Sequence, residues 1–143
     1  MNSPEAWALS PEACLMIRTE IQIRLPNSPG SLARVAALLA AEKVRILALS
    51  LESGGTARLV VDNVERAAHA LAQEHLRVEK RDVLFTRVSA RSLGSLLTAA
   101  ADAGVNLEYL YASSAEGSPD ANGVMAVVLG VDDAMSASVA AGI

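Results

Sequence analysis

The sequence predicts an α+β fold made of two similar units, and three observations support this prediction. Short segments in which apolar and polar residues alternate, as in half-buried strands, are followed by segments with apolar residues at helical spacing. In the first half of the chain these segments come in the order strand, helix, strand, strand, helix, strand. The apolar pattern of that half then returns in the second half, which indicates an internal repeat.

The first strand and helix are separated by a short polar turn. Ile21, Ile23 and Leu25 alternate with polar residues and predict a strand. An apolar stripe at positions i, i+3, i+4 and i+7 then predicts a helix, and its members are Leu32, Val35, Ala36 and Leu39. Between them, Ser28 is expected to be the N-cap and Pro29 the first helical residue, since proline has no N–H to leave unpaired there.

This turn is also a candidate anion site. Gly30 has no side chain to keep a ligand away, and the backbone N–H groups of Gly30, Ser31 and Leu32 are expected to point out of the positive end of the helix. Taken alone, the turn is better explained as an ordinary capped helix after a strand.

The remaining elements of the first half complete a known arrangement. Residues 46–52 and 57–62 are expected to form a hairpin around Ser53-Gly54-Gly55. A second helix follows, capped by Asp62 or Asn63, with its apolar stripe at Val64, Ala67, Ala68 and Leu71. A long strand over 77–88 closes the unit. Two helices on one face of an antiparallel sheet in βαββαβ order form the ferredoxin-like arrangement.

The second half repeats this pattern at an interval of 61 residues. In that register the positions of Leu32, Val35, Ala36, Leu39, Val44 and Ile46 are taken by Leu93, Leu96, Leu97, Ala100, Val105 and Leu107. The turn over 113–123 is longer than its counterpart and is expected to be a surface loop. The predicted division is an N-terminal arm at 1–19, a first unit at 20–82 and a second unit at 83–143. The second unit lacks a last strand of its own and shares the strand at 77–88.

Composition excludes several classes of function. Hydrophobic residues make up 52% and charged residues 20% of the chain, which suits a globular core. The net charge is −4 and the 12 Lys and Arg residues are scattered, so neither a nucleic-acid surface nor a polybasic membrane patch is expected. No apolar run reaches membrane-spanning length. Cys14 is the single cysteine, which excludes an intrachain disulfide and a cysteine-rich zinc site. A cytoplasmic location is expected.

Other polar residues have structural explanations. His69 and His75 are six residues apart, so they do not share a helix face as a metal pair would, and they are expected at the surface. Tyr109 and Tyr111 are expected on one side of a strand, where they line a pocket or pack at an interface. No nucleophile and base stand at a motif spacing, so no catalytic residue, cofactor or metal site is expected and the chain is not expected to be an enzyme.

The motif at 27–32, Asn-Ser-Pro-Gly-Ser-Leu, together with the βαββαβ order and its repetition, resembles the ACT domain, a small amino-acid-sensing module. Residues 20–143 are similar to stand-alone double-ACT proteins. The resemblance implies two units paired side by side and a free amino acid bound where units meet. In the family, the loop before the first helix of one unit faces the start of the second strand of its partner, where an Asn is common.

Carried onto this sequence, the resemblance implies one composite site. The first unit keeps the loop but has Arg45 in the position of the Asn, whereas the second unit has Asn106 there but has Arg91 in place of Gly30. The loop would then bind the carboxylate of the ligand, and the segment at Asn106 and Leu107 would contribute from the other unit. The expected ligand-binding residues are Asn27, Ser28, Pro29, Gly30, Ser31, Leu32, Asn106 and Leu107.

Three functions remain open from the sequence. The first is a non-catalytic regulatory protein that senses an amino acid. The second is a regulatory subunit or scaffold that acts through protein contacts, with vestigial ligand sites. The third, a small enzyme, would need an acid–base pair that the sequence does not contain. A homodimer is expected because sheet edges need pairing and because alanine-rich helices allow close approach, and an enzyme of amino-acid metabolism is a further expected partner.

Overall fold

The computed structural model of the chain describes residues 16–114 and 124–133. Its elements, in chain order, are β1 (Met16–Arg24), α2 (Ser31–Ala41), β2 (Ile46–Leu51), β3 (Thr56–Val61), α3 (Val64–Gln73), β4 (Glu79–Ser89), the 3₁₀ turn η1 (Ala90–Ser92), α4 (Leu93–Asp102), β5 (Leu107–Ser114) and β6 (Val124–Val131). The predicted α+β class is confirmed. None of the described helices has the length and apolar character needed to cross a membrane.

The described residues fall into two compact units. Residues 19–81 form the first unit, and residues 16–18 with those from 82 onward form the second, so the division runs through β1 and β4. Residues 16–19, which the sequence analysis assigned to an N-terminal arm, form the beginning of β1. Residues 1–15 of that arm, residues 115–123 of the predicted loop and residues 134–143 of the predicted second unit lie outside the described residues.

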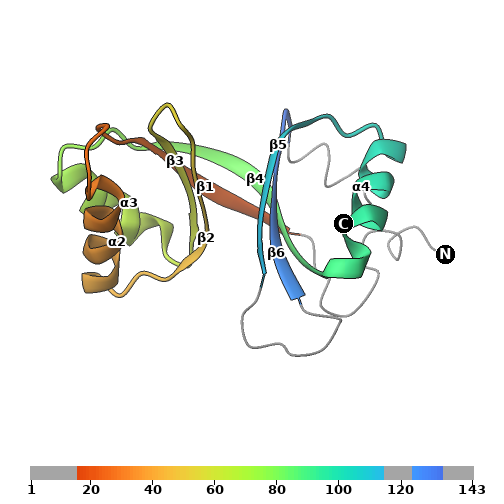
Figure 1. Ribbon diagram of the computed structural model, residues 1–143, viewed down its shortest axis with the longest axis horizontal. Helices are drawn as coiled ribbons and strands as arrows, with labels where there is room; N and C mark the ends of the chain where they lie inside the picture. Colours follow the sequence, from red (N-terminus) through yellow and green to blue (C-terminus); the bar gives the residue numbers. More distant parts are fainter. Residues whose placement is uncertain (1–15, 115–123, 134–143) are drawn as a thin grey trace. The chain divides into compact units, whose positions relative to one another are not determined.

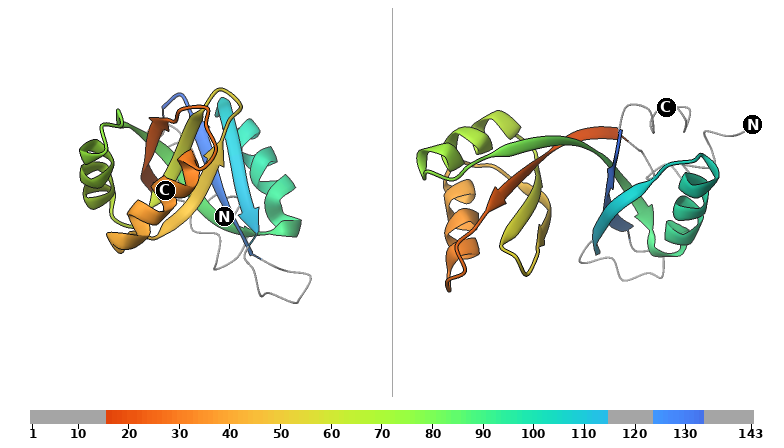
Figure 2. Two further views of the ribbon diagram at one scale, coloured as in Figure 1. Left: turned by 60° about the vertical axis from the view of Figure 1, so that its left-hand side comes forward. Right: turned by 90° about the horizontal axis from the view of Figure 1, so that it is seen from above.

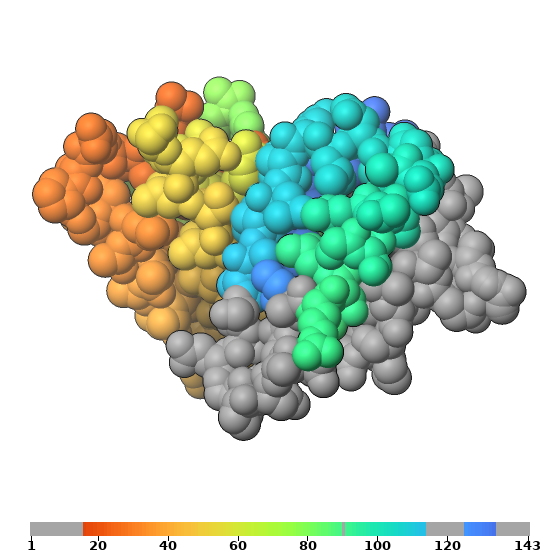
Figure 3. Space-filling model, turned by 45° about the vertical axis from the view of Figure 1, so that its right-hand side comes forward, coloured from red at the N-terminus to blue at the C-terminus, as the bar shows by residue number. Residues whose placement is uncertain are grey.

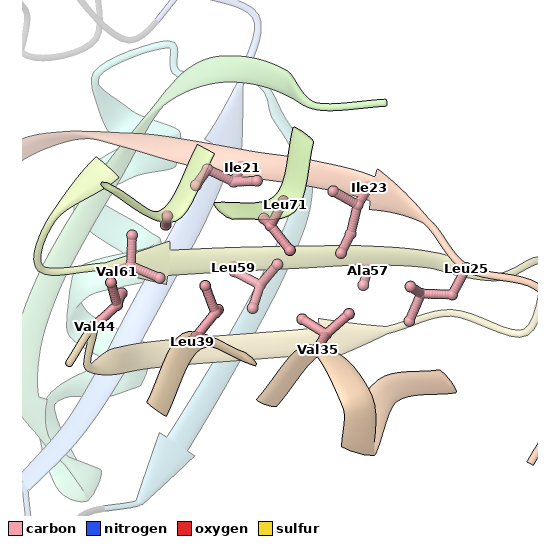
Figure 4. Packing of buried hydrophobic residues seen from close by; sticks show 11 residues of the cluster. Ile21, Ile23, Leu25, Val35, Leu39, Val44, Ala57, Leu59, Val61 and Leu71 are labelled. Carbon is pink, nitrogen blue, oxygen red and sulfur yellow. The ribbon is translucent and has the colours of Figure 1, made fainter. Parts of the chain in front are cut away.

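The first unit has an antiparallel sheet with strand order β2-β3-β1, and α2 and α3 cover one of its faces (Figure 1). Ile21 of β1 lies opposite Leu59 of β3, and Leu59 in turn lies opposite Leu49 of β2. The core between sheet and helices is made of aliphatic side chains that point toward one another (Figure 4), namely Ile21, Ile23, Leu25, Val35, Leu39, Val44, Ala57, Leu59, Val61, Ala67 and Leu71. The alternation predicted for the first strand therefore places its apolar residues on the helix-covered face.

The second unit has the strand order β4-β6-β5, again antiparallel, with α4 on one face of the sheet (Figures 1 and 2). Its core contains Leu84, Val88, Leu96, Ala100, Val127, Leu129 and Val131. The same turn ends the first helix of each unit. Val44 donates its N–H to the Leu39 carbonyl at 2.9 Å, and Val105, 61 residues later, donates to the Ala100 carbonyl at 3.0 Å. Buried positions in the two helices thus follow the 61-residue interval.

The helix starts differ in part from the expectation. The second helix of the first unit is capped by Asn63, whose Oδ1 accepts the N–H of Arg66 at 3.1 Å. Asp62, the other candidate cap, instead accepts the N–H of Arg45 at 2.9 Å. The expected start of the first helix was wrong: α2 begins at Ser31 and its N-cap is Gly30 in the left-handed conformation, with φ of 85°. Neither Ser28 nor Pro29 is the N-cap or a helical residue.

One buried hydroxyl in the second core has no hydrogen-bond partner. Thr86 is 1% exposed on β4, and its Oγ1 bonds to no group among the described residues. A buried polar group without a partner costs about 1–3 kcal/mol. Thr86→Val should therefore stabilise the protein by about 1 kcal/mol, because the change removes that group at nearly constant volume. Urea unfolding should show a higher midpoint with an unchanged slope.

Thr98→Val is the matched control for this prediction. The Thr98 hydroxyl is exposed and donates to the Gly94 carbonyl at 2.9 Å, so the same chemical change there should not raise stability. An equal or lower midpoint for Thr86→Val would show that the hydroxyl finds a partner in solution.

Candidate functional site

The turn between β1 and α2 is held by bonds among its own residues. The Ser28 N–H donates to the Pro26 carbonyl at 2.9 Å, and the Ser31 hydroxyl donates to the same oxygen at 3.0 Å. The hydroxyl oxygens of Ser28 and Ser31 lie 2.9 Å apart. Because these serines bond to each other and to Pro26, Ser28 does not cap the helix. This is the physical reason why the predicted N-cap was wrong.

The start of α2 leaves backbone donors without partners. The Gly30 carbonyl accepts the N–H of Arg34 at 2.9 Å, which is the first bond of the helix, and the Ser31 N–H donates to the Ser28 carbonyl at 3.3 Å. Within the described part of the chain, the N–H groups of Gly30, Leu32 and Ala33 have no acceptor. The predicted set was Gly30, Ser31 and Leu32, so Ala33 replaces Ser31. These donors and the helix dipole make this end of the first unit attractive to an anion.

The glycine at this helix start has open space beside it. A Cβ built on Gly30 would meet no atom within 4 Å, so the position is unobstructed on that side. The constraint on residue 30 is its positive φ, which a residue with a side chain adopts only with strain. Glycine therefore serves here to turn the chain into the helix.

The β2–β3 hairpin packs directly against the end of β1. The Leu25 N–H donates to the Gly55 carbonyl at 2.8 Å, and the Gly55 N–H donates to the Glu52 carbonyl at 2.9 Å. Gly55 has φ of 92°, and a Cβ there would lie 2.7 Å from the Leu25 carbonyl oxygen. The close approach of two backbone segments requires glycine at this position.

A cavity of about 550 Å³ lies between these two segments of the first unit. Its lining comes from the β1–α2 turn and from the hairpin, and comprises Leu25, Pro26, Asn27, Ser28, Gly30, Ser31, Leu32, Ala33, Leu51, Glu52, Ser53, Gly54 and Gly55. The start of α2, in orange, and the hairpin, in yellow, are both visible on the surface of this unit (Figure 3). The volume is large enough for a small metabolite.

Among the described residues, the cavity lining contains a single ionisable side chain, Glu52. Its Oε2 accepts the Nε–H of Arg58 at 2.9 Å. The Arg58 Nη1 also lies 3.7 Å from Oε1 of Glu20, a fully buried carboxylate that accepts a further bond from Gln22 at 3.1 Å. Arg58 therefore links a fixed buried carboxylate to the carboxylate at the cavity.

The structure brings together most of the predicted ligand-binding residues. Asn27, Ser28, Gly30, Ser31 and Leu32 all line the cavity, while Pro29 lies in the same turn without lining it. The other two predicted residues belong to the second unit, where Asn106 is exposed between α4 and β5 and Leu107 begins β5 against the second core.

Sequence reasoning missed the hairpin as a wall of the cavity. The residues concerned are Leu51, Glu52, Ser53, Gly54 and Gly55. The predicted ferredoxin-like arrangement did contain the signal, because it sets β3 beside β1 and so brings the β2–β3 turn to the end of β1. The sequence analysis used Ser53-Gly54-Gly55 only as a turn.

The corresponding turn of the second unit is built differently. The hydroxyl oxygens of Ser89 and Ser92 lie 2.8 Å apart, which reproduces the serine pair of the first unit 61 residues later. Arg91 stands where the first unit has Gly30, and it does not adopt a positive φ. The 3₁₀ turn η1 leads straight into α4, so this helix start lacks the left-handed entry found at Gly30.

Two tyrosines form a small aromatic group on the second sheet. Tyr109 and Tyr111 were predicted to share one side of their strand, and their rings stack with centroids 6.3 Å apart. A Cβ on Gly130 would lie 2.2 Å from the Tyr109 ring, so glycine makes room for that ring.

Among the described residues, no group of three or more His, Cys, Asp or Glu side chains is placed to hold a metal ion.

The described residues form an α+β protein of two units with antiparallel sheets, and the comparisons with known proteins bear on that fold. The sequence matches no protein-family model and no curated protein. Among solved structures, protein BT0572 from Bacteroides thetaiotaomicron is 25% identical with a TM-score of 0.75, covering 88% of this chain and 87% of that one.

Two further solved structures are regulatory subunits of aspartate kinase. The subunit from Thermus flavus is 18% identical with a TM-score of 0.59, covering 92% of this chain and 95% of that one. The ligand-free subunit from Thermus thermophilus is 17% identical with a TM-score of 0.59, covering 90% and 95%. These likenesses show a shared fold, and they confirm the predicted fold class, α+β with ferredoxin-like units.

Proposed function

We propose that this chain is a non-catalytic regulatory protein that binds a free amino acid in the cavity of the first unit. The observation that carries the proposal is the set of N–H groups at Gly30, Leu32 and Ala33, which have no partner among the described residues and which belong to residues that line the cavity. A carboxylate is the amino-acid group that such donors bind. The shared fold with regulatory subunits of aspartate kinase supports the regulatory part of the proposal.

The expected affinity is that of a metabolite sensor. Each hydrogen bond to a charged group contributes about 1.5–3 kcal/mol, and ordering the ligand and the loop offsets part of this gain. A dissociation constant of about 1 μM to 1 mM follows. The residues we propose to contact the ligand are those of the turn, Asn27 to Leu32. The contribution of Asn106 and Leu107 from the second unit stays a prediction.

A thermal-shift screen of the free amino acids tests this function directly. Each free amino acid is added at millimolar concentration, and one or a few related ones should raise the melting temperature, because a ligand that prefers the folded state stabilises it by about 2.7 kcal/mol at 100 times its Kd. The corresponding amino-acid amides, which lack the carboxylate, are the control and should give no shift. If none of the amino acids raises the melting temperature, the proposal is overturned.

The second candidate is a regulatory subunit or scaffold that acts through protein contacts, with vestigial ligand sites. The turn at Arg91 favours this second candidate, because that turn has lost the glycine conformation seen at Gly30.

The expected homodimer also stays a proposal. It is supported by the edge strand β2, on which Leu49 is 39% and Leu51 51% exposed.

A further inference from the structure

The charge of the cavity lining points to the class of amino acid that fits, an inference that rests on the proposed function. Within the part of the chain that the structure describes, Glu52 is the single ionisable side chain in the lining, which includes neither Lys nor Arg. The carboxylate of a ligand would therefore be bound by backbone N–H groups and by neutral side chains, without a cationic side chain. A second negative charge on the ligand would find no cationic side chain in the lining and would face the Glu52 carboxylate instead.

Glu52 has one carboxylate oxygen that can accept a further hydrogen bond. Arg58 occupies its Oε2, while Oε1 has no partner among the described residues. Arg58 is itself only 15% exposed and lies beside the buried Glu20, so its guanidinium is fixed rather than free to follow the ligand. The Glu52 side chain is 47% exposed, which leaves it accessible from the cavity side of the hairpin. An ammonium group is the natural partner of the remaining oxygen.

The rest of the lining is apolar or neutral. Leu25, Leu32 and Leu51 supply aliphatic surface, and the hydroxyl and amide groups come from Asn27, Ser28, Ser31 and Ser53. Nothing in the lining would pair with a charged ligand side chain once Glu52 has accepted the α-ammonium group. Burying such an unpaired charge is unfavourable.

We infer that the cavity selects a zwitterionic amino acid whose side chain is uncharged, and that Glu52 binds the ammonium group of this ligand. Two groups of opposite charge on the ligand then meet two ends of one cavity, the N–H groups at the start of α2 and the Glu52 carboxylate on the hairpin. Arg58 acts as a positioning residue that holds this carboxylate.

Calorimetry with matched ligands tests the inference. The probes are the twenty free amino acids and, for the tightest of them, the carboxylic acid that lacks its amino group, which is 4-methylpentanoate in the case of leucine. An amino acid with an uncharged side chain should bind most tightly. Its des-amino analogue should bind about tenfold more weakly, as expected for the loss of a hydrogen bond between charged groups at a half-exposed site.

The variant Glu52→Gln should remove this discrimination. Gln retains a hydrogen-bonding oxygen for Arg58 but loses the negative charge, so the amino acid and its des-amino analogue should bind within about twofold of each other. Glu65→Gln makes the same charge change at a side chain that is 87% exposed and outside the cavity lining, and it should keep the parent's discrimination. The melting temperature of each ligand-free variant verifies that it is folded.

The outcomes separate this inference from the proposed function. Binding of no amino acid would overturn both. Tightest binding of an acidic or basic amino acid, or a Glu52→Gln variant that discriminates as the parent does, would overturn the charge selection and leave amino-acid binding intact.

Discussion

Gly30→Asp is expected to abolish amino-acid binding, whereas Gly30→Asn should weaken it far less. Both side chains begin in open space, since a Cβ at residue 30 has no neighbour within 4 Å. The aspartate, however, places a negative charge beside the N–H groups of Gly30, Leu32 and Ala33, where the carboxylate of the ligand would bind. Repulsion and competition for the same donors should lower affinity by about 100-fold or more.

The two variants share one structural cost. Gly30 has φ of 85°, so any side chain at this position must adopt the left-handed conformation. Asn and Asp are the side chains that tolerate the left-handed region best, and each should lose about 1 kcal/mol of stability. Because that loss is common to both, the difference in affinity between Asp and Asn, measured by calorimetry, isolates the effect of the charge.

Gly94→Asp serves as a control in the second unit. Gly94 lies near the start of α4, has no neighbour within 4 Å of a built Cβ and has no positive φ. The substitution should leave binding unchanged and should be neutral or slightly stabilising, since a carboxylate near a helix N-terminus interacts well with the dipole. If Gly30→Asp and Gly30→Asn bind alike, the helix start is not where the carboxylate of the ligand lies.

The sequence predicted the elements of this fold because buried faces leave a periodic pattern. Val35 and Leu39 are buried where the helical stripe placed them, and the 61-residue interval placed Leu96 and Ala100 correctly in the second unit. Burial determines which residue types occupy these positions, and the spacing of apolar residues in the sequence therefore follows the buried face directly. Ala36, a member of the same stripe, is exposed, and Leu38 is the residue that packs beside the core instead.

The details of the candidate site could not be predicted in the same way. Whether Ser28 caps a helix or pairs with Ser31 depends on which of several nearby partners its hydroxyl reaches, and hydrophobic spacing carries no information on that choice. Similarly, Gly54 and Gly55 are equivalent in the sequence pattern of a turn. Their difference depends on the neighbouring strand, which approaches Gly55 alone.

Gly55→Ala is expected to destabilise the protein by about 2–4 kcal/mol. The new Cβ would lie 2.7 Å from the Leu25 carbonyl oxygen, and the φ of 92° is strained for alanine in any case. The obstructing atom is backbone, held by the Leu25 N–H bond to Gly55, so it cannot move aside as a flexible side chain would. Urea unfolding should show a lower midpoint with an unchanged slope.

Gly54→Ala is the matched control, one residue away in the same turn. A Cβ on Gly54 meets no atom within 4 Å and its φ is not positive, so stability should change by less than about 0.5 kcal/mol. Both glycines line the cavity, but only Gly55 joins the hairpin to β1. Gly55→Ala should therefore also weaken amino-acid binding by moving the hairpin away from the start of α2. Equal stabilities for the two variants would mean that the hairpin is not held against Leu25 in solution, and the cavity would then lack one of its walls.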